Sequence, residues 1–262
     1  MRANKWLLVP PGHLRFYGNI HGSTGLAAHR NIFTHPTLEY LTIDNHPGKV
    51  DELEPMSLPL TPIVTPLKVL RASGVDVRTL TPALALPLGL QKLTLKFTSP
   101  TTNSFVKGYM QSSTALTLKA ALGNHFGTLR YIDLHHHCLT EFDWSWCEVL
   151  RDLRVHQDHI FSTYRAWTAR LRTFLPKTLE RLTIHGCDFT TGPKGVCVLE
   201  TSLLHLVDEL EADQLSVNDF DRLKEITLVL AAESPEPTET LKQRCVESHV
   251  MWSIKSDLEA ET

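Results

Sequence analysis

The sequence predicts an α/β solenoid, a fold in which repeated strand-containing segments stack into one parallel sheet. A short pattern of spaced aliphatic residues recurs along the 262-residue chain. A Leu-Pro-x-x-Leu segment leads into two of its copies, and segments with helical spacing of apolar residues lie between copies. A single copy is too short to bury its own apolar face, whereas stacked copies share a core. The repeat therefore indicates the architecture before any individual motif does.

The repeated pattern is Leu, two variable residues, an aliphatic residue, one variable residue and a second aliphatic residue. Its copies are LEYLTI (38–43), LQKLTL (90–95), LRYIDL (129–134), LERLTI (179–184) and LKEITL (223–228), with a degenerate copy LKVLRA (67–72) and a weaker candidate at 13–17. This is the strand pattern of a leucine-rich repeat (LRR). We predict an LRR solenoid over residues 1–233, with a parallel sheet on the concave side and irregular helices on the convex side. A C-terminal loop and capping helix are expected over residues 234–262.

The distances between copies predict where helices are inserted. Consecutive first leucines, at positions 38, 67, 90, 129, 179 and 223, lie 29, 23, 39, 50 and 44 residues apart. The last three distances exceed one repeat of roughly 20–29 residues, so they must contain helices or degenerate strands. Helical spacing of apolar residues favours helices at 105–122, 198–210 and 239–258, and two helices within 144–175 that break near 156–158.

The composition argues against several classes of protein. The net charge is −3 and opposite charges are interspersed, which disfavours nucleic acid or an anionic membrane as the partner. The five cysteines include no C-x-x-C pair, a usage typical of reduced thiols. The apolar run at 6–9 is too short for a signal-peptide core, and no stretch approaches the length of a membrane span. We therefore expect a cytoplasmic or nuclear protein.

The Leu-Pro-x-x-Leu lead-in followed by Leu-x-x-Leu-Thr-[Leu/Ile] resembles the irregular LRR proteins of fungi and protists, many of which are F-box proteins. LALPLGLQKLTLKFT (84–98) and TFLPKTLERLTIHGCDFT (173–190) carry the resemblance, which extends over roughly residues 14–230. In that family a short N-terminal helical module docks onto a ubiquitin-ligase adaptor, and the LRR arc binds a substrate. The resemblance thus implies the substrate-binding part of a ubiquitin ligase. A docking segment of the form L-P-x-E-[LI] is not found in this sequence.

The variable positions of each copy are the candidate partner-binding residues. Successive strand residues alternate between two faces, so these positions form columns on the concave face. Tyrosine and arginine favour protein interfaces because they combine a large contact area with directed hydrogen bonds. We expect an unidentified protein partner to contact Tyr40, Thr42, Asp44, Arg71, Lys92, Lys96, Tyr131, Asp133, His135, Arg181, His185 and Glu225. The alternative is a structural or decayed LRR protein with no dedicated partner.

Motifs for catalysis and metal binding are incomplete, so we expect no enzymatic activity, no cofactor and no metal ion. The run from His135 to Cys138 has imidazole and thiolate groups that suit zinc, but consecutive strand residues point to opposite faces. We interpret the run as a strand exit, and a zinc site that recruits His156 or His159 is the alternative. The H-x-x-H spacing of these two histidines lacks the glutamate of a metalloprotease motif and is interpreted as solvated surface. Cys187 falls on the Asn/Cys position of the LRR pattern, whose side chain caps backbone groups.

Overall fold

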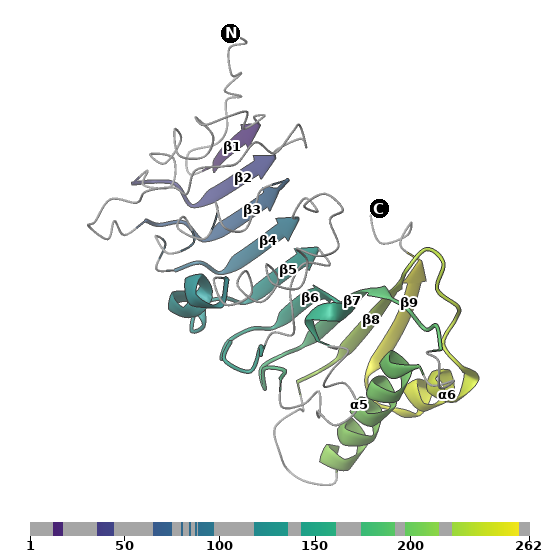
Figure 1. The fold of residues 1–262 in the computed structure, drawn as a ribbon. Coiled ribbons are helices and arrows are strands. Elements are labelled where there is room, and N and C mark those ends of the chain that lie inside the picture. The colour runs from purple at the N-terminus through teal and green to yellow at the C-terminus, as the bar shows by residue number, and fades with distance from the viewer. Residues whose placement is uncertain are drawn as a thin grey trace. The chain divides into compact units, whose positions relative to one another are not determined.

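The computed structural model describes residues 13–17, 36–44, 65–74, 80, 84, 87, 89–96, 118–135, 143–160, 174–191, 197–214 and 222–256. The chain forms two compact units, Met1–Leu129 and Arg130–Thr262. In each unit, parallel strands lie side by side in the order of the sequence (Figure 1). The α/β class and the parallel pairing that the repeats predict are therefore confirmed.

Among the described residues, the sheet of the N-terminal unit comprises β1 (His13–Tyr17), β2 (Tyr40–Asp44), β3 (Val69–Ser73) and β4 (Lys92–Lys96). Each strand pairs with the next without a register shift. The register places Leu41, Leu70 and Leu93 side by side, and each of them is at most 1% exposed. Residues 118–122 are helical and continue into η2 (Gly123–His125). The aliphatic positions of the repeat thus form the core of this unit.

In the part of the C-terminal unit that the structure describes, the sheet comprises β5 (Tyr131–His135), β6 (Asp152–His156), β7 (Arg181–Cys187), β8 (Glu225–Leu230) and β9 (Met251–Ser256). The 3-10 turn η3 (Gln157–His159) follows β6, and the helices α5 (Val198–Gln214) and α6 (Glu239–Glu247) precede β8 and β9. Ile132, Leu153, Leu182 and Ile226 lie in one row and are buried. As in the leucine row of the N-terminal unit, each residue of this row is the fourth residue of its copy of the repeat.

The same backbone hydrogen bonds recur between successive copies of the repeat. The carbonyl oxygen of the second residue of a copy accepts hydrogen bonds from the N–H groups of the second and third residues of the next copy. Glu39 O, for example, accepts from Lys68 N at 2.8 Å and Val69 N at 3.0 Å. The arrangement also links Lys68 with Gln91 and Lys92, Arg130 with Arg151 and Asp152, Arg151 with Glu180 and Arg181, and Glu180 with Lys224 and Glu225. The backbone groups at each strand start are thereby satisfied in the same way.

The prediction of two helices in residues 144–175 is wrong for the part that the structure describes. Turns at 145–149, strand β6 and the short η3 occupy residues 145–159. LRDLRV (150–155) is a further copy of the repeat and forms β6. Leu150 and Leu153 are three residues apart, a spacing that fits a helix as well as the repeat. Residues 161–173 lie outside the described residues.

The other helix predictions have mixed outcomes. Helix α5 confirms the helix predicted at 198–210. The helix predicted at 239–258 is only partly correct, because α6 ends at Glu247 and β9 pairs in parallel with β8. Of the helix predicted at 105–122, only 118–122 is described, and it is helical. The weak candidate at 13–17 is strand β1. The division of the chain at residue 233 stays a prediction.

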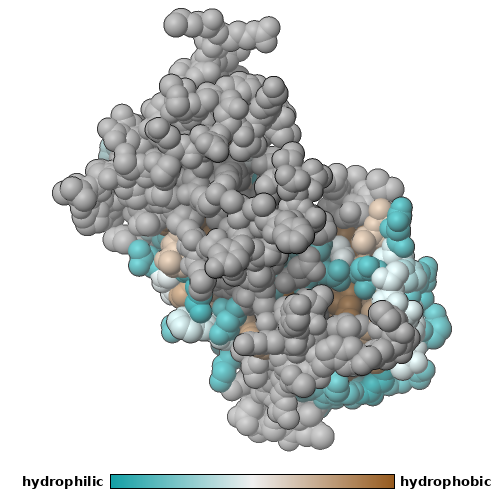
Figure 2. Space-filling model, viewed as in Figure 1, coloured by the Kyte–Doolittle hydropathy of each residue, from teal (hydrophilic) through white to brown (hydrophobic). Residues whose placement is uncertain are grey.

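Helix α6 packs against the aliphatic side of β8 and β9. Leu241 and Cys245 of α6 are buried, and together with Leu228, Trp252 and Ile254 they line a groove of about 340 Å³. Figure 2 shows hydrophobic surface over β8 and β9 among mainly hydrophilic side chains. Among the helices that the structure describes, none has the length and apolar character needed to cross a membrane.

Candidate recognition face and histidine cluster

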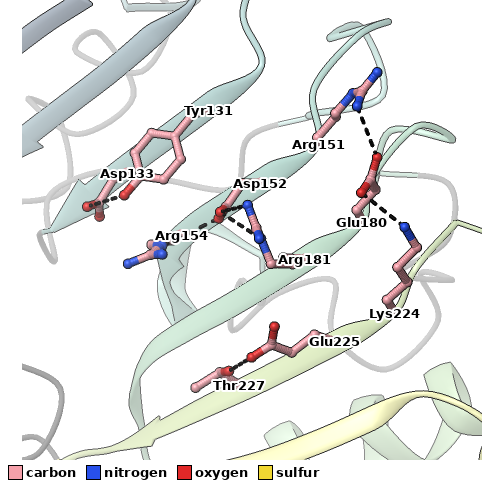
Figure 3. Close-up of polar contacts among 10 residues, drawn as sticks. All are labelled: Tyr131, Asp133, Arg151, Asp152, Arg154, Glu180, Arg181, Lys224, Glu225 and Thr227. Atoms are coloured by element: carbon pink, nitrogen blue, oxygen red, sulfur yellow. Dashed lines mark hydrogen bonds and ion pairs between the residues drawn. The ribbon is translucent and has the colours of Figure 1, made fainter.

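The side of the C-terminal sheet opposite the aliphatic row carries polar residues, and we call it the polar face. The alternation along β5 to β8 places polar side chains there at every second position. On β9, Ser253 continues the pattern, whereas Met251, which pairs with Glu225, is apolar and exposed. The polar face consists of Tyr131, Asp133, Asp152, Arg154, Arg181, Thr183, Glu225, Thr227 and Ser253, seven of which are drawn in Figure 3. Strand register brings together residues that are far apart in the sequence, from Tyr131 on β5 to Ser253 on β9.

Asp152 lies at the centre of the polar face and binds two arginines. Arg181 donates to Asp152 Oδ2 from Nε and Nη2, both at 2.9 Å. Arg154 Nε donates to Asp152 Oδ1 at 3.4 Å. The Asp152 side chain is 5% exposed, whereas those of Arg154 and Arg181 are 43% and 58% exposed. The buried carboxylate therefore orients two guanidinium groups that remain accessible to solvent (Figure 3).

Tyr131 and Asp133 extend this network along β5. The Arg154 guanidinium lies over the Tyr131 ring, 5.3 Å from its centroid, which is cation–π geometry. The Tyr131 hydroxyl donates to Asp133 Oδ2 at 3.1 Å. Burial, followed by the charge of Asp133, raises the pKa of Tyr131, so the phenol is neutral at ordinary pH. Burial alone would raise the pKa of Asp133, but neighbouring His135, Tyr131 and Arg154 outweigh it and hold this pKa below its usual value.

The polar network continues across β8 and β9. Thr227 is buried, and its hydroxyl lies 2.9 Å from the Ser253 hydroxyl and 3.4 Å from Glu225 Oε1. A separate line of exposed charges follows the strand starts, where Glu180 pairs with Arg151 at 3.5 Å and with Lys224 at 3.3 Å. The hydrogen bond and charge of Lys224 hold the pKa of Glu180 below its usual value. Polar side chains therefore lie on the polar face and also along the strand starts beside it.

The residues predicted to bind a partner in the N-terminal unit also share one face. The register places Tyr40, Val69 and Lys92 in one row, and Thr42, Arg71 and Thr94 in the next. A third row joins Asp44 and Ser73 to Lys96, although the Asp44 side chain lies outside the described residues. Arg71 and Lys96 are exposed, whereas Tyr40, Thr42 and Lys92 are half-buried.

In the C-terminal unit the structure adds two strands to the predicted face. Tyr131 and Arg181 belong to consecutive copies of the repeat recognised in the sequence, but β6 lies between their strands. Sequence reasoning therefore missed Asp152 and Arg154, and it also missed Ser253 on β9. The signal for β6 was the Leu-x-x-Leu-x-Val pattern of residues 150–155. Val229, which the alternation would place outward, is buried.

A cluster of His and Asp side chains lies at the ends of β5 to β7. Asp133 Oδ1 is 2.8 Å from His135 Nε2, and the rings of His135 and His185 are 4.7 Å apart between centroids. His156 and His159 are buried, with ring centroids 6.3 Å apart. The prediction that these two histidines are solvated is therefore wrong. The residues at 136–138, which form the rest of the predicted histidine run, lie outside the described residues.

The described cysteines are buried and have no disulfide partners: Cys147, Cys187, Cys197 and Cys245. Burial raises the pKa of Cys147, Cys187 and Cys245 to about 12 in each case. A nucleophilic cysteine needs the opposite shift, since the thiolate is the reactive form. Cys187 Sγ donates to the Ile184 carbonyl oxygen at 3.2 Å, which is the backbone capping expected at that position of the repeat.

Comparisons of the chain with models of protein families, with curated proteins and with solved structures give no significant match. Two arrangements of this chain's own residues are suited to binding: the arginine network on the polar face and the histidine cluster at the strand ends.

Proposed function

We propose that this chain is a non-enzymatic LRR scaffold that binds a folded protein partner through its polar face. Three features of the fold support the LRR assignment. The repeats form parallel strands in sequence order, their aliphatic residues are buried, and the same backbone hydrogen bonds link successive copies. A sheet built in this way leaves one face available for binding, because only the aliphatic side is needed for the core.

The observation that carries the proposal is the arginine pair held by Asp152. Binding energy at interfaces is concentrated in tyrosine, tryptophan and arginine side chains, and Tyr131, Arg154 and Arg181 are adjacent here. Ordering a long side chain at an interface costs roughly 0.5–1.5 kcal/mol. Asp152 has already oriented both guanidinium groups, so part of this cost is met during folding. Each planar guanidinium can still donate to a carboxylate or a carbonyl oxygen of the partner.

The charges of the polar face indicate the chemistry of the partner. Two arginines alternate with three carboxylates, those of Asp133, Asp152 and Glu225, so the face has no strong net field. A partner of mixed charge with carboxylates opposite Arg154 and Arg181 fits this pattern. By resemblance to F-box proteins, we propose that this partner is a substrate of a ubiquitin ligase. The competing hypothesis is that the chain is an LRR protein whose polar face has no dedicated partner.

The test is quantitative affinity purification from the native cell with the full chain as bait. Wild type is compared with Arg154→Ala/Arg181→Ala, which should reduce recovery of a true partner by roughly 10- to 100-fold, corresponding to the loss of one or two hot-spot side chains. Arg154→Lys/Arg181→Lys keeps both charges next to Asp152 but lacks the planar fork. We expect an intermediate recovery for this second variant, which also guards against loss of folding.

The matched control is Arg151→Ala/Lys224→Ala, which removes the same charge from the exposed strand starts. Its partners should match those of wild type. If all four baits recover the same proteins in the same amounts, the polar face is not the binding site. This result would favour the hypothesis that the protein has no dedicated partner. Co-purification of a ubiquitin-ligase adaptor with wild type would support the ligase role. If wild type reproducibly recovers a partner without any such adaptor, the result would argue against that role.

A further inference from the structure

We propose that Asp133, His135 and His185 bind one zinc ion. Each of them offers one ligand atom, and these atoms all lie within 4.8 Å of one another. In a tetrahedral zinc site with bonds of about 2.0–2.2 Å, neighbouring ligand atoms are roughly 3.4 Å apart. Small side-chain rotations therefore convert the present arrangement into a ligand set. Two imidazole nitrogens and one carboxylate oxygen are donors that zinc prefers, and they leave a fourth position for water.

The fold brings these ligands together from two strands that are not neighbours. His135 ends β5, His185 lies in β7, and β6 runs between them. On β6, His156 pairs in register with His185, and its Nε2 would be only 2.0 Å from a Cβ atom added at Gly186. The His156 ring thus packs against the backbone of Gly186, where there is no side chain. His135 and His185 nevertheless meet, with ring centroids 4.7 Å apart.

The carboxylate is held in a position that suits a metal ligand. The Asp133 side chain is 9% exposed, and its Oδ2 accepts a hydrogen bond from the Tyr131 hydroxyl at 3.1 Å. This contact directs the other oxygen, Oδ1, toward His135 Nε2 at 2.8 Å. Metal-binding carboxylates are commonly oriented by such an outer hydrogen bond. The His135 side chain is 34% exposed, so an ion can reach the cluster from solvent.

Two simpler arrangements make different predictions. If Asp133 and His135 form only an ion pair, His185 is not required and no metal binds. If the zinc-binding group is instead the run from His135 to Cys138, Cys138 is required and His185 is not. The proposed site requires His185 and Asp133 but not Cys138. Zinc binding by these residues requires no protein partner, so the result of its test is independent of the test of the proposed function.

The experiment is a zinc titration of the purified full chain after treatment with a chelator, followed by calorimetry and by metal analysis of the dialysed protein. We expect one zinc per chain in wild type and loss of this binding in His185→Ala and in Asp133→Asn. Tyr131→Phe should bind roughly 10-fold more weakly, because the outer hydrogen bond is lost. Cobalt can replace zinc as a spectroscopic probe, and its visible bands should be those of nitrogen and oxygen ligands without a thiolate band.

The controls separate this site from unspecific binding by other histidines. His205→Ala and His249→Ala remove exposed histidines elsewhere in the C-terminal unit and should leave the stoichiometry unchanged, as should Cys138→Ser. Zinc should raise the Tm of wild type but not of His185→Ala, and metal-free Tm values report whether each variant folds. The proposal is overturned if wild type shows no saturable binding, if His185→Ala and Asp133→Asn still bind one zinc, or if Cys138→Ser abolishes binding.

Discussion

Asp152 orders the polar face because a single buried carboxylate contacts both exposed arginines. Asp152→Ala removes these charge-assisted hydrogen bonds. The freed guanidinium groups can be hydrated, since their side chains are 43% and 58% exposed. We therefore expect a loss of about 1–3 kcal/mol in the free energy of unfolding, below the cost of leaving a fully buried charge unpaired.

Urea unfolding of Asp152→Ala and wild type measures this loss. Glu180→Ala is the control. Like Asp152, Glu180 is a carboxylate with two cationic partners, but these partners lie at the exposed strand starts. Its effect should be clearly smaller, since exposed ion pairs contribute little. Equal losses in the two variants would show that Asp152 has no special structural role.

Gly186 is the second residue whose identity the fold requires. Its φ is +64°, a conformation that costs a residue with a Cβ atom roughly 1–2 kcal/mol. A Cβ atom there would also lie 2.0 Å from His156 Nε2. Gly186→Ala should therefore lower the free energy of unfolding by at least about 1 kcal/mol, whereas Gly127→Ala, with open space around it, should not.

A double-mutant cycle separates the two causes at Gly186. If the contact with His156 contributes, Gly186→Ala should cost less in a His156→Ala background than in wild type. The part that remains is the backbone strain. Equal costs in both backgrounds would mean that His156 moves aside without penalty, and a neutral Gly186→Ala would contradict the backbone argument itself.

At the level of secondary structure, α6 depends on its N-terminal cap. The Thr238 hydroxyl accepts a hydrogen bond from Leu241 N and donates one to Glu200 of α5. Arg244 adds contacts from α6 to Asp208 and Glu211 of α5. The cap thus fixes the start of α6 and joins it to the neighbouring helix.

Thr238→Ala should reduce the free energy of unfolding by about 1 kcal/mol, the usual cost of losing a capping hydroxyl. Thr238→Ser keeps the hydroxyl and should remain close to wild type. Thermal unfolding followed by circular dichroism provides the comparison. A Thr238→Ser variant as unstable as Thr238→Ala would assign the effect to the lost methyl group instead of the cap.

For the molecule as a whole, buried thiols predict how stability changes with pH. The pKa of Cys147 is raised by burial from about 9 to about 12. Above pH 9 the unfolded chain releases this proton, whereas the native chain keeps it, so stability falls as the pH rises from 9 toward 12. Between pH 8 and pH 10 this one thiol should cost about 1 kcal/mol of unfolding free energy.

Cys147→Ala tests this assignment. The variant should be less stable than wild type at pH 8, because it leaves a cavity, but its loss of stability between pH 8 and pH 10 should be smaller. Urea unfolding at both pH values gives the two differences. An identical pH dependence in the two proteins would show that Cys147 does not contribute to it.

The sequence by itself determined that the recognised repeats form parallel strands, and it determined the face on which their variable residues lie. Each repeat carries this information locally, because Leu-x-x-Leu-x-Leu fixes which residues enter the core and identical copies stack in register. Helix α5 also follows from local periodicity. Tyr131, Asp133 and Arg181 could therefore be placed on one polar face without a structure.

Only the tertiary structure decided β6, β9 and the contacts between distant side chains. Leu150 and Leu153 fit a helix and a strand equally well, and pairing with β5 and β7 favours the strand. In β9 the first leucine of the pattern is replaced by His249, so pairing with the edge of β8 takes the place of the local signal. His185 meets Asp133 and His135 across an intervening strand. Such proximity depends on how strands separated by tens of residues pack, which no local pattern encodes.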